Sequence, residues 1–166
     1  MSDIERIAAQ ERRLVFSRFD EETAFALGSA IRARGLVERW PIVVEIRTFD
    51  RPLFYAALPG STADNANWAR RKFNVVRHFG RSTYRMVLEQ KSPDRALKTG
   101  FGLSVSDYVL AGGGFPVTVQ GAGVIGAIMV SGLPERQDHG VIVEALCAHL
   151  KVPPAELLLA AEPLHD

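Results

Sequence analysis

Residues 108–150 read YVLAGGGFPVTVQGAGVIGAIMVSGLPERQDHGVIVEALCAHL, and this stretch decides the fold. Val124–Ser131 is a continuous apolar run of strand length. Gly132-Leu133-Pro134 then opens a helix that ends near Leu150. Shorter strand pieces are expected before this run, at Tyr108–Ala111 and Pro116–Gln120, broken by Gly112-Gly113-Gly114. The stretch therefore predicts strands that are close neighbours in sequence and a helix that packs back on them.

The rest of the chain supplies more helices and a hairpin. In chain order we expect a polar surface helix at Asp3–Arg13, a strand at Leu14–Phe19, a helix from the N-cap Asp20 to Gly35, hairpin strands at Ile42–Phe49 and Pro52–Leu58, a long helix from Ser61 or Thr62 to Phe79, a helix at Thr83–Gln90 and, after Pro153, a helical tail. Because adjacent strands are close enough to form hairpins, the predicted class is α/β of the α+β kind. A central antiparallel sheet is flanked by helices, in one domain over 1–166. An N-terminal helix covers about 1–13, the core 14–150 and the tail 151–166.

Composition limits the classes of protein to consider. The 166 residues are 47% hydrophobic and 23% charged, with a net charge of +1, as in a globular protein with no general attraction to nucleic acid. One cysteine, Cys147, excludes an intramolecular disulfide framework and a cysteine-based zinc site. No secretory signal or membrane-spanning run is apparent, so we expect no membrane association and a cytoplasmic location.

The long helix carries a lysine on its apolar side. Lys72 falls among the hydrophobic positions, so its ammonium should meet a carboxylate or an anionic ligand, or extend past the apolar surface to water. Arginines at positions 70, 71, 77 and 81 occupy the opposite face, for which solvent or a subunit contact is preferred to a specific anion site. His78 lies on the same arc and is a weak candidate for haem ligation.

The last helix carries further polar groups. Asp138 is expected either to cap the helix through its free amides or to approach Lys72 or a bound ligand. His149 is expected to be hydrogen-bonded at the edge of the core, and Cys147 to be a packing residue. His139 is a second weak candidate for haem ligation.

The glycine run also has two interpretations. Gly112–Gly114 can form a bulge that turns the strand, or a surface on which a flat ligand rests with its anionic groups near backbone amides. Phe115, which follows, is either a ligand-binding or a packed aromatic. No phosphate-loop lysine follows the glycines, and no catalytic triad, paired carboxylates or metal-spaced histidines are apparent.

Taken together, these motifs resemble the haem-degrading-domain family of GlcG- and HbpS-like proteins, in its small stand-alone branch. The matching segments are Gly113-Gly114-Phe115-Pro116, Gly123 to Gly132 and Gln137-Asp138-His139, with Lys72 and Phe79 on the long helix. The resemblance covers roughly Ile42 to Leu150. It implies an α-β-α sandwich related in shape to profilin and PAS-type folds, homo-oligomers built from dimers, and haem or corrinoid-related binding or haem degradation. Phe73, Val75, Val76 and Met129 are bulkier than the residues of haem-binding relatives and would fill a pocket there.

We therefore carry several hypotheses of function. The first is a non-catalytic, oligomeric binding or accessory protein, with haem or another planar or anionic ligand near Lys72, Gly113, Gly114, Phe115, Ser131 and Asp138. The second is a haem-handling or haem-degrading enzyme that uses the same cleft. The third is an interaction module whose arginine face recruits a protein. The polar loop Lys91–Gly102 is either a lid or a connector.

Overall fold

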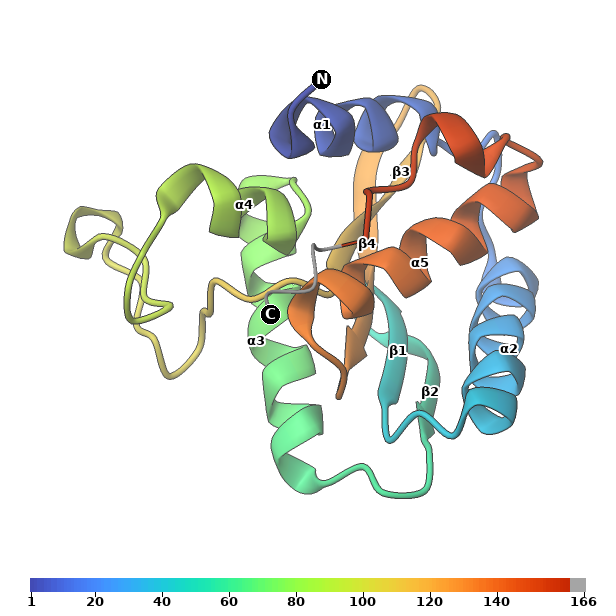
Figure 1. Ribbon diagram of the computed structural model, residues 1–166, viewed down its shortest axis with the longest axis horizontal. Helices are drawn as coiled ribbons and strands as arrows, with labels where there is room; N and C mark the ends of the chain where they lie inside the picture. Colours follow the sequence, from blue (N-terminus) through green and yellow to red (C-terminus); the bar gives the residue numbers. More distant parts are fainter. Residues whose placement is uncertain (162–166) are drawn as a thin grey trace.

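The architecture is a four-stranded antiparallel sheet between two layers of helices (Figure 1). The computed structural model describes residues 1–161. The strand order is β2-β1-β4-β3, and every neighbouring pair is antiparallel. The strands span Val43–Thr48 (β1), Pro52–Ala57 (β2), Gly114–Val119 (β3) and Gly123–Ser131 (β4). The helices are Asp3–Arg13 (α1), Glu21–Glu38 (α2), Ala63–Phe79 (α3), Thr83–Gln90 (α4) and Glu135–Leu150 (α5). The predicted α+β class is confirmed.

Alternation along β4 assigns each face of the sheet to a helix layer. Ile128 and Val130 belong to the large core that α2 and α5 cover, whereas Ala127 and Met129 face the smaller core beneath α3. Phe73 and Val76 of α3 complete the smaller core, and both are buried. Of the bulky residues noted in the sequence, Phe73, Val76 and Met129 therefore fill the space between α3 and the sheet.

The segment between α4 and β3 packs as a connector. Leu97 and Leu110 are buried in a third cluster with Val75 of α3 and Met86 of α4. Within the segment, Thr99–Phe101 forms one 3-10 turn (η1). Through these side chains the segment packs against α3 and α4.

Two expected strands are absent from the sheet. Phe16 forms only an isolated parallel bridge with Val119, and residues 108–111 pair with no strand, although Val109, Leu110 and Ala111 are buried. Both segments are apolar because they fill the core, and burial alone does not supply a ladder of hydrogen bonds. β3 instead begins at Gly114, inside the glycine run.

Two expected helix ends also differ from the structure. α2 continues past Gly35 to Glu38 and ends where Arg39 adopts a left-handed conformation, with φ of 57°. Gly35 is buried inside the helix, where an added Cβ would lie 2.6 Å from Leu58 Cδ2, so this glycine packs closely against Leu58 and does not end the helix. The expected C-terminal helix is a single 3-10 turn, Pro154–Glu156 (η2), and its last positions, 162–166, lie outside the described residues.

The remaining helix predictions agree closely with the structure. Ser2 and Glu5 form a capping box at the start of α1, and Asp20 Oδ1 accepts a hydrogen bond from Thr23 N at the start of α2. Thr62 is the N-cap of α3. None of the helices in residues 1–161 has the length and apolar character needed to cross a membrane.

Candidate functional site

Lys72 is buried, and its ammonium group is hydrogen-bonded near the end of β4. Its Nζ donates hydrogen bonds to Val130 O at 3.0 Å and to Asp138 Oδ2 at 3.3 Å, and the residue is 3% exposed. The expected pairing with a carboxylate is therefore observed, and the ammonium does not extend to water. Burial lowers the pKa of Lys72, against the opposing effect of Asp138.

Asp138 joins that lysine to the loop before α5. Pro134 holds the N-cap position, so the expected capping role of Asp138 on amides farther along the helix is wrong. Instead Asp138 Oδ1 accepts a hydrogen bond from Leu133 N at 3.0 Å, before the helix begins. Burial raises the pKa of Asp138 to about 6, although Lys72 and the Leu133 amide act to lower it.

The glycine turn closes over this ion pair. Gly113 has a φ of 118°, its carbonyl accepts a hydrogen bond from Val130 N at 2.8 Å, and an added Cβ would lie 2.7 Å from Lys72 Nζ. Gly114 N donates to Thr83 Oγ1 at 2.9 Å. Ser131, at the end of β4, is also buried. The structure thus brings Lys72, Gly113, Gly114 and Asp138 together as one packed group, which we call the Lys72 cluster, and Ser131 follows the Val130 carbonyl that Lys72 binds.

Phe115 and His139 lie on the α5 side of the sheet. Phe115 belongs to the large core, and its ring centroid is 5.8 Å from that of His139. His139 is fully buried; its Nε2 is 2.8 Å from Gln10 Oε1, and its Nδ1 has no hydrogen-bond partner among the described residues. Burial lowers the pKa of His139 to about 3, so the imidazole is neutral. Both residues are therefore part of the packed interior.

His78 lies far from this interior, on the surface of α3. It is exposed, and its ring packs edge-on against Phe79 and Tyr108. Among residues 1–161 there is no group of three or more His, Cys, Asp or Glu side chains placed to hold a metal ion. The two histidines proposed as haem ligands are thus on separate parts of the molecule.

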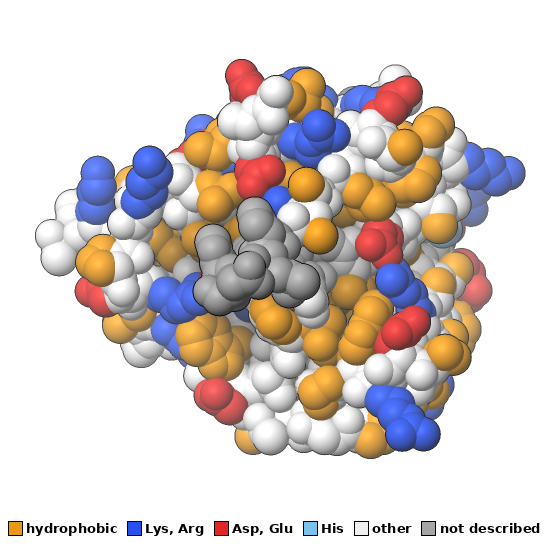
Figure 2. Space-filling model, in the orientation of Figure 1, with side chains coloured by type: hydrophobic (Ala, Val, Ile, Leu, Met, Phe, Trp, Pro, Cys, Tyr) orange, Lys and Arg blue, Asp and Glu red, His pale blue; other side chains and the backbone are white. Residues whose placement is uncertain are grey.

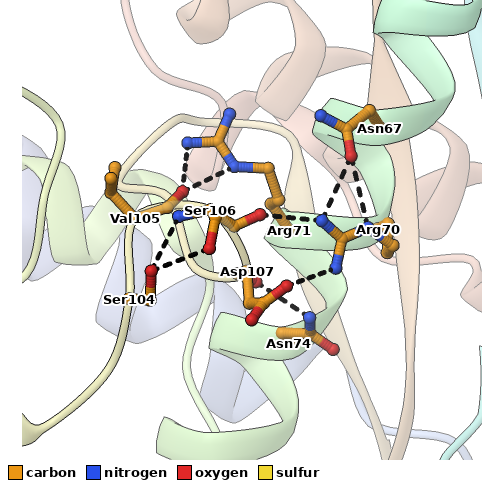
Figure 3. A network of polar contacts seen from close by, with 8 residues as sticks. All are labelled: Asn67, Arg70, Arg71, Asn74, Ser104, Val105, Ser106 and Asp107. Atoms are coloured by element: carbon orange, nitrogen blue, oxygen red, sulfur yellow. Dashed lines mark hydrogen bonds and ion pairs between the residues drawn. The ribbon is translucent and has the colours of Figure 1, made fainter.

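The arginine face of α3 holds a loop of the same chain (Figure 3). Arg70 Nη2 donates to Ser106 O at 2.7 Å, and Arg71 Nε donates to Val105 O at 2.9 Å. Asn74 Nδ2 adds a bond to Asp107 O at 2.8 Å. The Arg70 side chain is 48% exposed, as expected for a solvent-facing position, while Arg70 and Arg71 also bind the backbone carbonyls of Ser106 and Val105.

An apolar groove of about 780 Å³ lies between α2 and α5. Aliphatic side chains line most of it, among them Leu27, Ile31, Val141, Ala145, Val152 and Leu158. Figure 2 shows apolar side chains between the two helices with charged groups among them. The charged residues that line the groove are Arg34 and Glu144, which form an ion pair between the two helices. We call this feature the α2–α5 groove.

Two residues with donor atoms also line the α2–α5 groove. His149 is exposed, whereas the sequence indicates a hydrogen-bonded residue at the edge of the core. Its ring centroid is 5.9 Å from that of Phe16. Cys147 is buried as expected, and burial raises the pKa of its thiol, which keeps the proton on sulfur. The groove was not predicted from the sequence because its walls come from helices whose lining residues lie more than a hundred positions apart, such as Leu27 and Val141. The available signal was α2, which carries apolar residues on more than one side.

Comparison with known proteins agrees on one family. A family model described as haem degrading protein HbpS-like matches residues 19–147. The UPF0303 protein mlr5144 of Mesorhizobium japonicum is 68% identical over 160 residues, which cover 96% of each chain. A UPF0303 protein of Brucella anthropi is 54% identical over 158 residues, covering 95% of this chain and 94% of the relative.

Solved structures support the same relationship. The crystal structure of Ybr137w matches with a TM-score of 0.81 and 25% identity, covering 89% of this chain and 87% of that one. HbpS matches with a TM-score of 0.61 and 20% identity, over 80% and 90% of the chains. A PduOC:heme complex matches with a TM-score of 0.64 and 21% identity, over 81% and 95%. The last two likenesses show a shared fold, and the family model and the close relatives show that the chain belongs to the HbpS-like family of haem degrading proteins.

Proposed function

We propose that the protein binds a planar, largely apolar molecule with carboxylate groups, of the haem class, in the α2–α5 groove. The observation that carries the proposal is the groove itself, whose volume of about 780 Å³ is that of a small-molecule site. The description of the chain's family and the heme complex of a structural neighbour support the choice of ligand class.

The side chains of the α2–α5 groove fit such a ligand. Its aliphatic walls would cover the macrocycle, and the Arg34 guanidinium is suited to bind a carboxylate. His149 would be the residue that holds the iron of a bound haem, since an imidazole is a common haem ligand and the Cys147 thiol retains its proton. A bound haem would supply an iron centre that accepts an imidazole nitrogen. The role that follows is that of a binding or accessory protein.

The Lys72 cluster is the second candidate location, for an anionic ligand. Its support is a buried cation beside a glycine turn whose backbone lies within van der Waals reach of Lys72 Nζ. Such a ligand would replace Asp138 as the partner of Lys72. Since Lys72 is 3% exposed, entry there needs the glycine turn to move, whereas the α2–α5 groove is open in this structure.

Haem titration followed by absorbance tests both locations. We expect a saturable shift of the Soret band in the wild-type protein and, in His149→Ala, a changed band with affinity reduced by about 10-fold or more. Ala148→Arg, at an exposed position of the α2–α5 groove, should also weaken binding. His78→Ala is the matched control and should behave as wild type.

The other outcomes separate the alternatives. Absence of a saturable shift in the wild-type protein would refute haem binding. A normal titration of His149→Ala and Ala148→Arg together with a lost one in Lys72→Met would move the site to the Lys72 cluster. Loss of the Soret band with release of iron, on adding ascorbate under air to the haem complex, would support the haem-degrading alternative.

A further inference from the structure

The outer side of α2 is an apolar surface that nothing in the described structure covers. Phe25 is 62% exposed, Leu36 42% and Val37 82%, although all belong to a helix whose opposite side is buried in the large core. In Figure 1, α2 lies at the edge of the molecule with no element beyond it. Several large apolar side chains exposed on one helix indicate a contact surface.

The residues on that side are arranged symmetrically along the helix. We call them the α2 outer stripe: Phe25, Ala26, Ser29, Ala33, Leu36 and Val37. About a midpoint at Ile31, Phe25 mirrors Val37, Ala26 mirrors Leu36, and Ser29 mirrors Ala33. An antiparallel copy of α2 would therefore place large side chains against partners at both ends and small ones at the centre. Small residues at the centre permit the close approach of helix axes, at about 8–10 Å.

The charges at the two ends of α2 match the same arrangement. Glu22 lies in the first turn and Arg39 at the C-cap, and both are exposed. Among the described residues, neither forms an ion pair within the chain. An antiparallel copy sets Glu22 of one chain beside Arg39 of the other, twice over. Arg32 lies at the margin of the stripe, where its long side chain can reach solvent.

The ring of Phe25 is held in place by a contact within the chain. This ring packs edge-on against Phe54 of β2, with centroids 6.2 Å apart, and so remains ordered while most of its surface is exposed. An ordered aromatic loses less conformational entropy on association than a mobile one.

We propose that the α2 outer stripe is an interface between two copies of this chain, packed antiparallel. The two-fold axis would cross the outer side of α2 at its midpoint, level with Ile31 along the helix. A second copy is the favoured occupant because the stripe is complementary to itself, as an isologous interface must be. The proposal is independent of haem binding, because the α2–α5 groove lies on a different side of the helix.

Light scattering after gel filtration tests the interface. The wild-type protein should have at least twice the chain mass of 18.2 kDa. Ala33→Arg, at the centre of the stripe, should halve the mass of the particle while keeping a wild-type circular dichroism spectrum. Ala148→Arg is the matched control, an exposed alanine exchanged for arginine on the groove side, and should leave the mass unchanged. A monomeric wild type, an unaffected Ala33→Arg protein or a dissociated Ala148→Arg protein would overturn the proposal.

Charge reversal tests the antiparallel arrangement. Glu22→Arg and Arg39→Glu should each raise the dissociation constant, by about 10-fold if each is worth about 1.4 kcal/mol. The double variant should return it close to the wild-type value, since the residues meet only between chains. A double variant no tighter than either single variant would rule out this orientation.

Discussion

At the scale of single residues, the Lys72–Asp138 pair connects segments that are distant in sequence. Lys72 comes from α3, its acceptor Val130 from β4, and Asp138 from α5. Removing both charges from water costs free energy that their attraction only partly returns, so the pair is not in itself a source of stability. Its physical effect is to fix α3, the end of β4 and the start of α5 in one arrangement.

Replacing one partner should therefore be costly and replacing both should be tolerated. We expect Lys72→Met to lower the free energy of unfolding by about 3–5 kcal/mol near neutral pH, because it leaves a buried carboxylate without its cation. The Lys72→Met, Asp138→Leu double variant should recover most of this loss. Urea denaturation measures both, with Lys98→Met, at an exposed position, as the control. Equal losses in the single and double variants would contradict this account.

The loss in Lys72→Met should depend on pH. In the folded wild-type protein the pKa of Asp138 is raised from 3.8 to about 6, so its neutral form favours folding below about pH 4 and this contribution is lost as the pH rises through about 6. Without the Lys72 ammonium that pKa rises further, so the variant continues to lose stability above about pH 6.

The difference between the two proteins should thus be smallest near pH 5 and grow toward pH 8, by at most about 1.4 kcal/mol for each pH unit above about 6. His139, whose pKa is lowered to about 3, is present in both, so its titration cancels. Denaturation midpoints across this range measure the difference. A constant gap would show that Asp138 does not change its protonation there.

At the scale of elements, α3 fixes the loop before β3. Its arginines and Asn74 bind the carbonyls of residues 105–107, and Arg70 also pairs with Asp107 at 2.9 Å. Because these bonds are exposed to solvent, they should contribute little to global stability while restricting the local backbone. The loop therefore depends on α3 for its order.

Arg70→Ala should accordingly raise amide hydrogen exchange in residues 104–108 and leave the denaturation midpoint nearly unchanged. Arg77→Ala is the matched control, since Arg77 lies on the same helix, is exposed, and has no hydrogen bond or ion pair among the described residues. Hydrogen exchange followed by mass spectrometry makes the comparison. Unaltered exchange in the loop would show that Arg71 and Asn74 hold it without Arg70.

Most of the helices and strands could be predicted from the sequence. The capped helices, the hairpin and the strand Val124–Ser131 have strong local signals, and helical periodicity alone placed Lys72 among apolar neighbours. The segments around Phe16 and Val109 look like strands because they are buried, but pairing depends on distant partners. The α2–α5 groove could not be predicted for the same reason, since it exists only once helices from opposite ends of the chain meet.

At the scale of the whole molecule, the two ends of the described chain hold each other. Gln10 Nε2 of α1 donates to Leu157 O at 2.7 Å, and Arg6 Nη1 donates to Glu156 O at 3.0 Å. Gln10 Oε1 also faces His139 Nε2 of α5. Both end segments lie outside residues 19–147, the part that the family model matches. The core that the family shares is therefore covered by contacts between α1 and residues 156–157, which we call the terminal clasp, and Gln10 of this clasp also contacts α5.

Gln10→Ala tests the terminal clasp. It leaves Leu157 O and His139 Nε2 buried without partners, so we expect the free energy of unfolding to fall by about 1–3 kcal/mol for each group left unsatisfied. Arg12→Ala, an exposed change on the same helix, should stay within about 0.5 kcal/mol of wild type. Thermal and urea unfolding measure both variants. Equal behaviour of the two would show that water replaces the glutamine.

The bond between Gln10 and Leu157 spans 147 positions of the chain and so sets an order of events during synthesis. Gln10 is made before the sheet and α3, and Leu157 is made after α5. The hydrogen bond of the Gln10 amide to Leu157 O can therefore form only after nearly all of the described chain has been made. By then the sheet and α3 have already had time to form. α1 can contact α4 before that point, because Glu11 accepts hydrogen bonds from Ser82 N and Arg85 Nη1, so a nascent chain stalled before Leu157 would lack only the bonds of α1 to residues 156 and 157.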